Sequence, residues 1–83
     1  MSYQDLLVYR LATTIYDGTV EFCRRFIHSP RLKDQMEQAA RSGKQNIVEG
    51  SLPKSYESCL KLIGVARASF GELLEDYKDF LRQ

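Results

Sequence analysis

The sequence predicts an all-α protein, an up-and-down helical bundle with three long helices. Pro30 and Pro53 are the only prolines, and they divide the 83 residues into three segments of helical length. Within each segment apolar residues recur at steps of three and four, which is the period of an amphipathic helix. β-Branched residues, which favour strands, are few. We therefore expect one helical-bundle domain over residues 1–83, with helices over about 3–27, 30–49 and 55–82.

The first predicted helix has one apolar face and a cationic C-terminal end. Gly18 weakens its middle by up to about 1 kcal/mol relative to alanine, so we expect close packing or a slight bend there. The cations Arg24, Arg25 and His28 suit the negative end of the helix dipole. Its apolar face consists of Val8, Leu11, Ala12, Ile15, Thr19, Phe22, Cys23 and Phe26.

The second predicted helix has clear signals at both ends. Ser29 followed by Pro30 reads as an N-cap and the first helical position. Gly50 suits a left-handed C-terminal cap, and residues 51–54 suit a short loop. The middle of the inner face is small, which lets a neighbouring helix approach closely. That face consists of Leu32, Met36, Ala39, Ala40, Gly43 and Ile47.

The third predicted helix, with Ser55 as N-cap, has the strongest periodicity. Its seam advances by alternate steps of four and three through Cys59, Ile63, Ala66, Phe70, Leu73, Tyr77 and Phe80. Leu60, Leu74 and Leu81 widen this face beyond what two preceding helices easily cover. The sequence ends at Gln83, soon after an apolar pair. We therefore expect a bundle truncated before a fourth helix, or one whose fourth helix is supplied by another subunit.

Three segments resemble a known family. Residues 38–50, Gln-Ala-Ala-Arg-Ser-Gly-Lys-Gln-Asn-Ile-Val-Glu-Gly, resemble the AA-x-S-x-x-x-N-I-x-E-G signature of the four-helix-bundle proteins encoded in 23S rRNA intervening sequences. Residues 66–77 are similar to the family's A-x-x-S-x-x-E-L element, and residues 7–12 fit its first helix. The sequence of residues 44–51 looks closest to that of the four helix bundle suffix domain subgroup, which is bacterial.

The resemblance implies an up-and-down four-helix bundle that assembles into a ring, often a pentamer. The family includes the accessory variability determinant of diversity-generating retroelements, a basic barrel that binds nucleic acid and a reverse transcriptase. This chain departs from the pattern at Gly43, where the family usually carries isoleucine. The packing of the second helix is therefore expected to differ there.

The composition says more about the cellular compartment of the protein than about its binding partners. Net charge is +1, with +3 over residues 1–67 (ten Lys/Arg, seven Asp/Glu) and −2 over residues 68–83 (two Lys/Arg, four Asp/Glu). No apolar run approaches the roughly 18 residues of a membrane span. The first residues do not read as a signal peptide. We expect a cytoplasmic protein in which Cys23 and Cys59 are reduced.

One candidate interface is a basic surface on the first two helices. It comprises Arg24, Arg25, Arg31, Lys33, Arg41 and Lys44. Phosphate binding needs an array of cations with little acidic company. Asp34, Glu37 and Glu49 interrupt this array, which favours an ordinary solvated face of mixed charge over a binding surface. In a ring, copies of a weak patch would add into a larger field.

A second candidate is the polar group at the end of the second helix. Asn46 and Glu49 lie one turn apart, directly before Gly50. They are either a polar site in the bundle or a structural motif that orders the helix exit. We favour the second interpretation, with both side chains hydrogen-bonding the backbone of the following loop.

The sequence lacks the histidines and the residue spacings that known catalytic and metal-binding patterns require. A ferritin-like di-iron centre needs two Glu-x-x-His pairs, and His28 is the only histidine. A helical ribonuclease pattern of Arg-x4–6-His fails because only three residues separate Arg24 from His28. We expect no metal and no cofactor. The sequence predicts a non-enzymatic, homo-oligomeric scaffold, with a nucleic-acid-binding accessory protein as the alternative and a ribonuclease as a remote one. The partners expected are further copies of the chain, RNA or DNA, or another protein.

Overall fold

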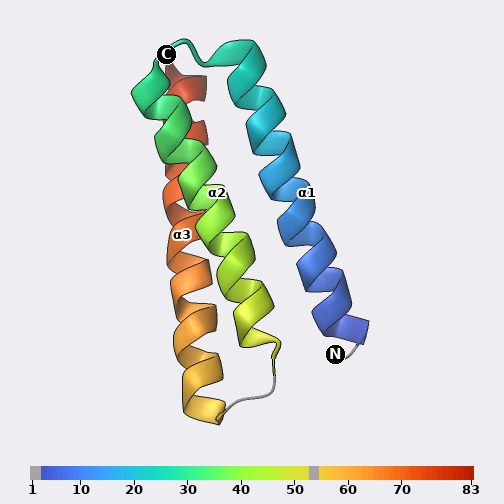
Figure 1. The fold of residues 1–83 in the computed structure, drawn as a ribbon. Helices are drawn as coiled ribbons and strands as arrows, with labels where there is room; N and C mark the ends of the chain where they lie inside the picture. The colour runs from blue at the N-terminus through green and yellow to red at the C-terminus, as the bar shows by residue number, and fades with distance from the viewer. Residues whose placement is uncertain (1–2, 53–54) are drawn as a thin grey trace.

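The computed structural model describes residues 3–52 and 55–83, and its regular elements there are all α-helices. They are α1 (Tyr3–Phe26), α2 (Pro30–Gly50) and α3 (Tyr56–Arg82). The helices run alternately up and down, so α1 and α3 are parallel and α2 opposes both (Figure 1). The predicted all-α bundle is confirmed, and each helix bound lies within one residue of the prediction. Pro53 and Lys54, in the predicted loop, lie outside the described residues.

Both predicted serine N-caps are confirmed. The hydroxyl oxygen of Ser29 accepts a hydrogen bond from the backbone N–H of Leu32 at 3.2 Å, and Pro30 occupies the first turn. The hydroxyl oxygen of Ser55 accepts in the same way from Ser58 at 3.1 Å. Each cap satisfies a backbone donor that the helix itself leaves without a partner.

The prediction of a left-handed cap at Gly50 is wrong. Gly50 is the last helical residue, and no described residue has a positive φ. The backbone N–H of Ser51 donates to the carbonyls of Ile47 and Val48 at 3.1 Å, which keeps the chain right-handed. The missing side chain at Gly50 has another use, since a Cβ there would lie 3.0 Å from Cδ1 of Ile63.

Helix α2 packs against both other helices and supplies four of the eight buried hydrophobic residues in the part of the chain that the structure describes. Its predicted inner face is confirmed at Met36, Ala39, Ala40, Gly43 and Ile47, all of which are buried. Half-buried Leu32 lies at the edge of that face. Because the face is small, the core is thin. The largest fully buried side chains among the described residues are Met36, Thr19 and Cys23.

Helices α1 and α3 contact each other through side chains near the C-terminal ends of both helices. The hydroxyls of Thr19 and Tyr77 lie 2.9 Å apart and share a hydrogen bond. The ring of Phe22 meets those of Tyr77 and Phe80 edge to face, with centroids 4.8 and 5.0 Å away. Phe26 adds a ring 5.1 Å from Phe22. This aromatic cluster closes one end of the gap between α1 and α3.

Cys23 and Cys59 are both free thiols. Cys23 is buried and Cys59 is half-buried, as expected of residues on apolar faces. Among the described residues, no helix combines the length and apolar character that crossing a bilayer requires.

Candidate functional site

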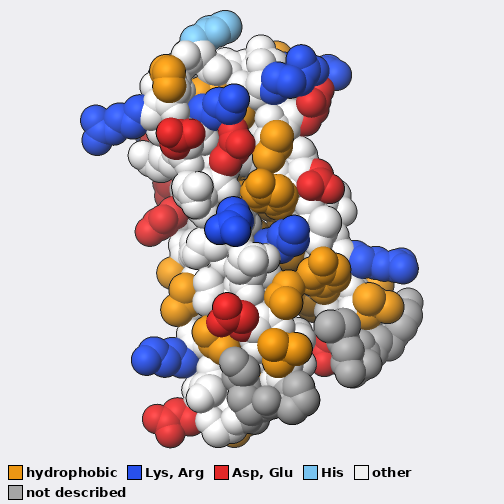
Figure 2. Space-filling view, in the orientation of Figure 1, with side chains coloured by type: hydrophobic (Ala, Val, Ile, Leu, Met, Phe, Trp, Pro, Cys, Tyr) orange, Lys and Arg blue, Asp and Glu red, His pale blue; other side chains and the backbone are white. Residues whose placement is uncertain are grey.

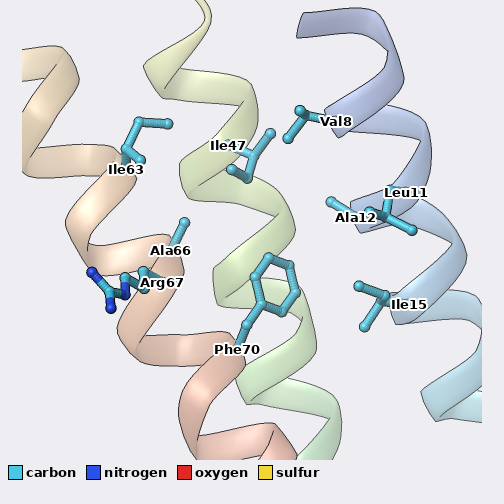
Figure 3. A pocket seen from close by; sticks show the side chains of 9 residues that line it. All are labelled: Val8, Leu11, Ala12, Ile15, Ile47, Ile63, Ala66, Arg67 and Phe70. Atoms are coloured by element: carbon cyan, nitrogen blue, oxygen red, sulfur yellow. The ribbon is translucent and has the colours of Figure 1, made fainter. Parts of the chain in front are cut away.

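An open apolar groove lies between the N-terminal halves of α1 and α3 (Figure 3). Its volume is about 240 Å³. The walls come from parallel helices, and α2 forms the floor. The lining residues are Val8, Leu11, Ala12 and Ile15 from α1, Ile47 from α2, and Ile63, Ala66, Arg67 and Phe70 from α3.

The floor and the rim of this groove differ in exposure. Ala12, Ile47 and Ala66 form a buried cluster at the floor. Above them Leu11 is 61% exposed and Ile63 is 44% exposed. Single exposed apolar residues are common on proteins, whereas a contiguous apolar surface indicates an interaction site. The two facing walls make this surface contiguous.

The groove continues toward the closed end of the bundle. A second hollow of about 190 Å³ is lined by Ile15, Phe70, Leu73, Leu74 and Tyr77. It shares Ile15 and Phe70 with the first. The ring of Phe70 therefore lies between two parts of one long depression, with α1 on one side and α3 on the other.

The predicted seam of α3 divides between the core and this groove. Ala66 and Leu73 are buried against α2, while Phe70, Tyr77 and Phe80 are half-buried. Ile63, another residue of the seam, stands on the groove wall and is exposed. The reason is geometric, because two helices cannot cover so broad a face.

Gly43 of α2 lies directly beneath Phe70. A Cβ built on Gly43 would lie 2.6 Å from Cε1 and Cζ of that ring. Beside it, the hydroxyls of Ser42 and Ser69 lie 2.9 Å apart and share a hydrogen bond between α2 and α3. Glycine at this position thus lets the Phe70 ring rest on the α2 backbone.

Arg24 and Arg25 of the predicted basic surface are engaged by one carboxylate. Arg24 donates to both oxygens of Glu21, at 2.6 and 3.0 Å, and Nε of Arg25 donates at 2.7 Å. These hydrogen bonds lower the pKa of Glu21 to about 2. The two guanidinium groups therefore offer less charge to a phosphate than the sequence suggested.

The other predicted cations are spread over α2. Arg31, Lys33 and Arg41 are exposed. Half-buried Lys44 places its ammonium group 5.2 Å from the centroid of the Tyr16 ring, a cation–π contact with α1. On the face shown in Figure 2, Lys and Arg alternate with Asp and Glu and do not form one basic field.

The structure corrects the interpretation of Asn46. Its amide donates to the backbone carbonyl of Ser42 at 2.8 Å, one turn back along α2 and not to the following loop. Glu49 is exposed, and its backbone carbonyl accepts from the N–H of Leu52 at 3.2 Å. Ser51 orders the exit instead, since its hydroxyl donates to the carbonyl of Ile47 at 2.9 Å. Sequence reasoning had not assigned Ser51 this role.

Two acidic groups carry buried oxygens. Oδ1 of Asp76 accepts from the amide of Gln35 at 2.9 Å, while Oδ2 of Asp76 and Oε2 of Glu37 are buried without a hydrogen-bond partner. Burial raises the pKa of Asp76. Burial, assisted by Glu37, also raises the pKa of the Cys23 thiol, which is therefore a poor nucleophile. Among the described residues no three His, Cys, Asp or Glu side chains gather as metal ligands.

Arg67 is the one charged residue among those that line the groove. Its heptad relation to Leu60 and Leu74 is the signal that would have placed it on the exposed side of α3.

No family model, curated protein or solved structure matches the chain. The groove, rather than a likeness to a known protein, is therefore the basis for assigning a function.

Proposed function

We propose that this protein is a cytoplasmic, non-enzymatic assembly module that self-associates through the groove between α1 and α3. The observation that carries the proposal is the exposed apolar lining of that groove, with Leu11 on one wall and Ile63 on the other. An apolar helix laid between these walls would become the fourth helix of the bundle. The two free thiols agree with a reducing compartment.

The exposed area supports association. A folded monomer of 9.6 kDa exposes about 5,100 Å² on average. This chain exposes 6,093 Å². The excess of about 1,000 Å² is close to the roughly 800 Å² that each partner buries in a standard interface. One partner of ordinary size would thus bring the exposure down to that of a compact protein.

The resemblance of residues 38–50 and 66–77 to the ring-forming family also favours self-association. The test is the solution mass of the chain by light scattering over a range of concentrations. A mass that is a multiple of 9.6 kDa is expected. Leu11→Glu should lower that mass to one chain, because it places a charge on the apolar wall. A chain that stays monomeric at every concentration overturns the proposal.

Nucleic-acid binding is a second proposal, favoured by the exposure of Arg31, Lys33 and Arg41 on one helix. Its test is binding of a generic RNA or DNA oligonucleotide at low salt, where phosphate contacts are strongest. Arg41→Glu combined with Lys44→Glu should abolish such binding while helicity is kept. No binding at low salt excludes this function, and binding that survives both charge reversals means the surface lies elsewhere.

A further inference from the structure

The α3 wall of the groove belongs to a longer apolar stripe. The stripe begins at Tyr56, advances by alternate steps of four and three residues, and ends at Leu81. Tyr56, Leu60, Ile63, Leu74 and Leu81 all stand on it, exposed by 44 to 79%. A repeat of 3.5 residues sustained over the length of a helix is the pattern by which one helix packs along another. The α2-facing residues Ala66 and Leu73 lie beside this stripe, not on it.

Two glycines flank the stripe, and the single chain gives no reason for either. Gly64 and Gly71 lie seven residues apart in the interior of α3, where glycine weakens a helix more than any residue except proline. Neither has a positive φ, and a Cβ on either would have nothing within 4 Å. Glycine at both positions is explained if another helix backbone approaches closely on this side.

We infer that two copies of this chain pair through α3, antiparallel, about a two-fold axis between Arg67 and Phe70. This inference rests on the proposed self-association and specifies its geometry. In such a pair each stripe residue meets the one equally far from the axis, so Ile63 faces Leu74 of the partner subunit. Arg67, the only charge on the stripe, meets the partner's Phe70, a cation–π arrangement.

The residues flanking the stripe fit the same register. Antiparallel coiled-coil geometry brings Gly64 beside the partner's Gly71, twice in the dimer, so the backbones can approach at the centre. It also brings Glu57 beside the partner's Lys78, again twice. In the single chain Lys78 has only an exposed contact with Glu75 at 3.4 Å, which contributes little. A parallel pair would place like residues together and lose this match.

The charge along α3 favours the antiparallel direction as well. Residues 56–69 carry Lys61 and Arg67 against Glu57, a net charge of +1, whereas residues 70–82 carry four acidic side chains against Lys78 and Arg82, a net charge of −2. Antiparallel pairing sets the basic half of each helix beside the acidic half of the other. Such complementarity selects the direction of approach.

A larger side chain at Gly71 tests the pairing without destabilising the monomer. Gly71→Leu has space in the single chain and a higher helix propensity, yet it obstructs the partner backbone at two places. We expect the dimer dissociation constant to rise about tenfold or more by analytical ultracentrifugation, with the helical circular-dichroism signal undiminished. The matched control is Ala68→Leu, which adds bulk to an exposed position off the stripe and should leave the dissociation constant unchanged.

Charge complementation tests the register. Ile63→Glu and Leu74→Lys chains should each be monomeric alone and should form a heterodimer when mixed, because the two charges then face each other. Ile63→Glu mixed with Leu60→Lys should not, since Leu60 faces the partner's Tyr77.

The outcomes separate this inference from the proposed function. A wild-type mass of two chains that Gly71→Leu lowers supports both. A dimer insensitive to Gly71→Leu, or a five-membered ring, overturns the α3 pairing and leaves self-association standing. A monomer at all concentrations overturns both.

Discussion

The ring of Phe70 rests on the bare backbone of Gly43, so closely that a methyl group on Gly43 would lie 2.6 Å from two ring atoms. This contact joins α3 to α2 at the middle of the bundle. It also sets the shape of the groove, because the same ring lines both of its hollows. The small residue on α2 and the aromatic residue on α3 therefore form one packing unit.

Gly43→Ala should lower the free energy of unfolding by about 1–2 kcal/mol. The added methyl group displaces the Phe70 ring, and the cost of that displacement exceeds the gain in helix propensity. In a Phe70→Leu background the same change should be neutral or stabilising by up to about 1 kcal/mol. Urea denaturation of the four chains at one fixed protein concentration measures both effects. An equal loss in the two backgrounds would show that the two side chains are not coupled.

Phe70→Ala should destabilise the chain by about 2–4 kcal/mol, toward the lower part of the range for buried phenylalanine because this ring is half-buried. The comparison is Leu74→Ala, an exposed residue four positions further along α3. Its effect on the monomer should stay below about 1 kcal/mol. A loss below about 1 kcal/mol for Phe70→Ala as well would mean that the ring contributes little to the packing of α3 on α2.

Sequence periodicity predicted the helices well because local rules govern them. The Ser29 and Ser55 caps, the two proline breaks and the small inner face of α2 all follow from neighbours within one or two turns. The division of α3 into a buried side and an exposed side does not. It depends on where α1 lies, and that in turn depends on tertiary contacts such as the Thr19–Tyr77 hydrogen bond, 58 residues apart in sequence.

The basic surface also shows that contacts between different helices could not be predicted from the sequence. A count of cations placed Arg24 and Arg25 together, but Glu21, three and four residues earlier on α1, holds both. That pairing was readable from helix spacing. The contact of Lys44 with Tyr16 was not, because it crosses from α2 to α1.

Gly18→Ala should stabilise the chain by up to about 1 kcal/mol. Gly18 follows Asp17, a pair typical of turns, yet α1 continues through it. The expectation of close packing there is wrong, because a Cβ on Gly18 would have nothing within 4 Å. Alanine therefore gains helix propensity without a clash. The midpoint of urea unfolding should rise; a fall would reveal a contact that this residue makes only in the assembled state.

Two carboxyl groups should move stability in opposite directions as pH falls. Glu21 has its pKa lowered from 4.5 to about 2 by Arg24 and Arg25, so its contribution is present above pH 4.5 and is lost as pH falls toward 2. Asp76 has its pKa raised by burial, so its ionisation disfavours folding. Its contribution is fully present below the unfolded pKa and is lost as pH rises through the folded pKa.

Single substitutions separate the two effects in urea-unfolding midpoints measured from pH 2 to 7. Glu21→Gln should remove the loss of stability between pH 4.5 and 2 that this carboxylate causes. Asp76→Asn should leave the chain as stable as the wild type, or more stable, at pH 7, since the amide oxygen can still accept from Gln35. A marked loss of stability at pH 7 in Asp76→Asn would mean that the ionised form is the favoured one.

The hydrogen bond between Thr19 and Tyr77 should be worth about 1 kcal/mol in coupling free energy. Thr19→Val keeps the shape of a fully buried side chain but removes its hydroxyl, and Tyr77→Phe removes the other partner. Each alone leaves a polar group without its partner, so each should cost about 1–2 kcal/mol. Together they should cost less than the sum, because no unpaired hydroxyl remains. Strict additivity in this double-mutant cycle would mean that the closed end of the groove is held by the aromatic cluster of Phe22 and Phe80 alone.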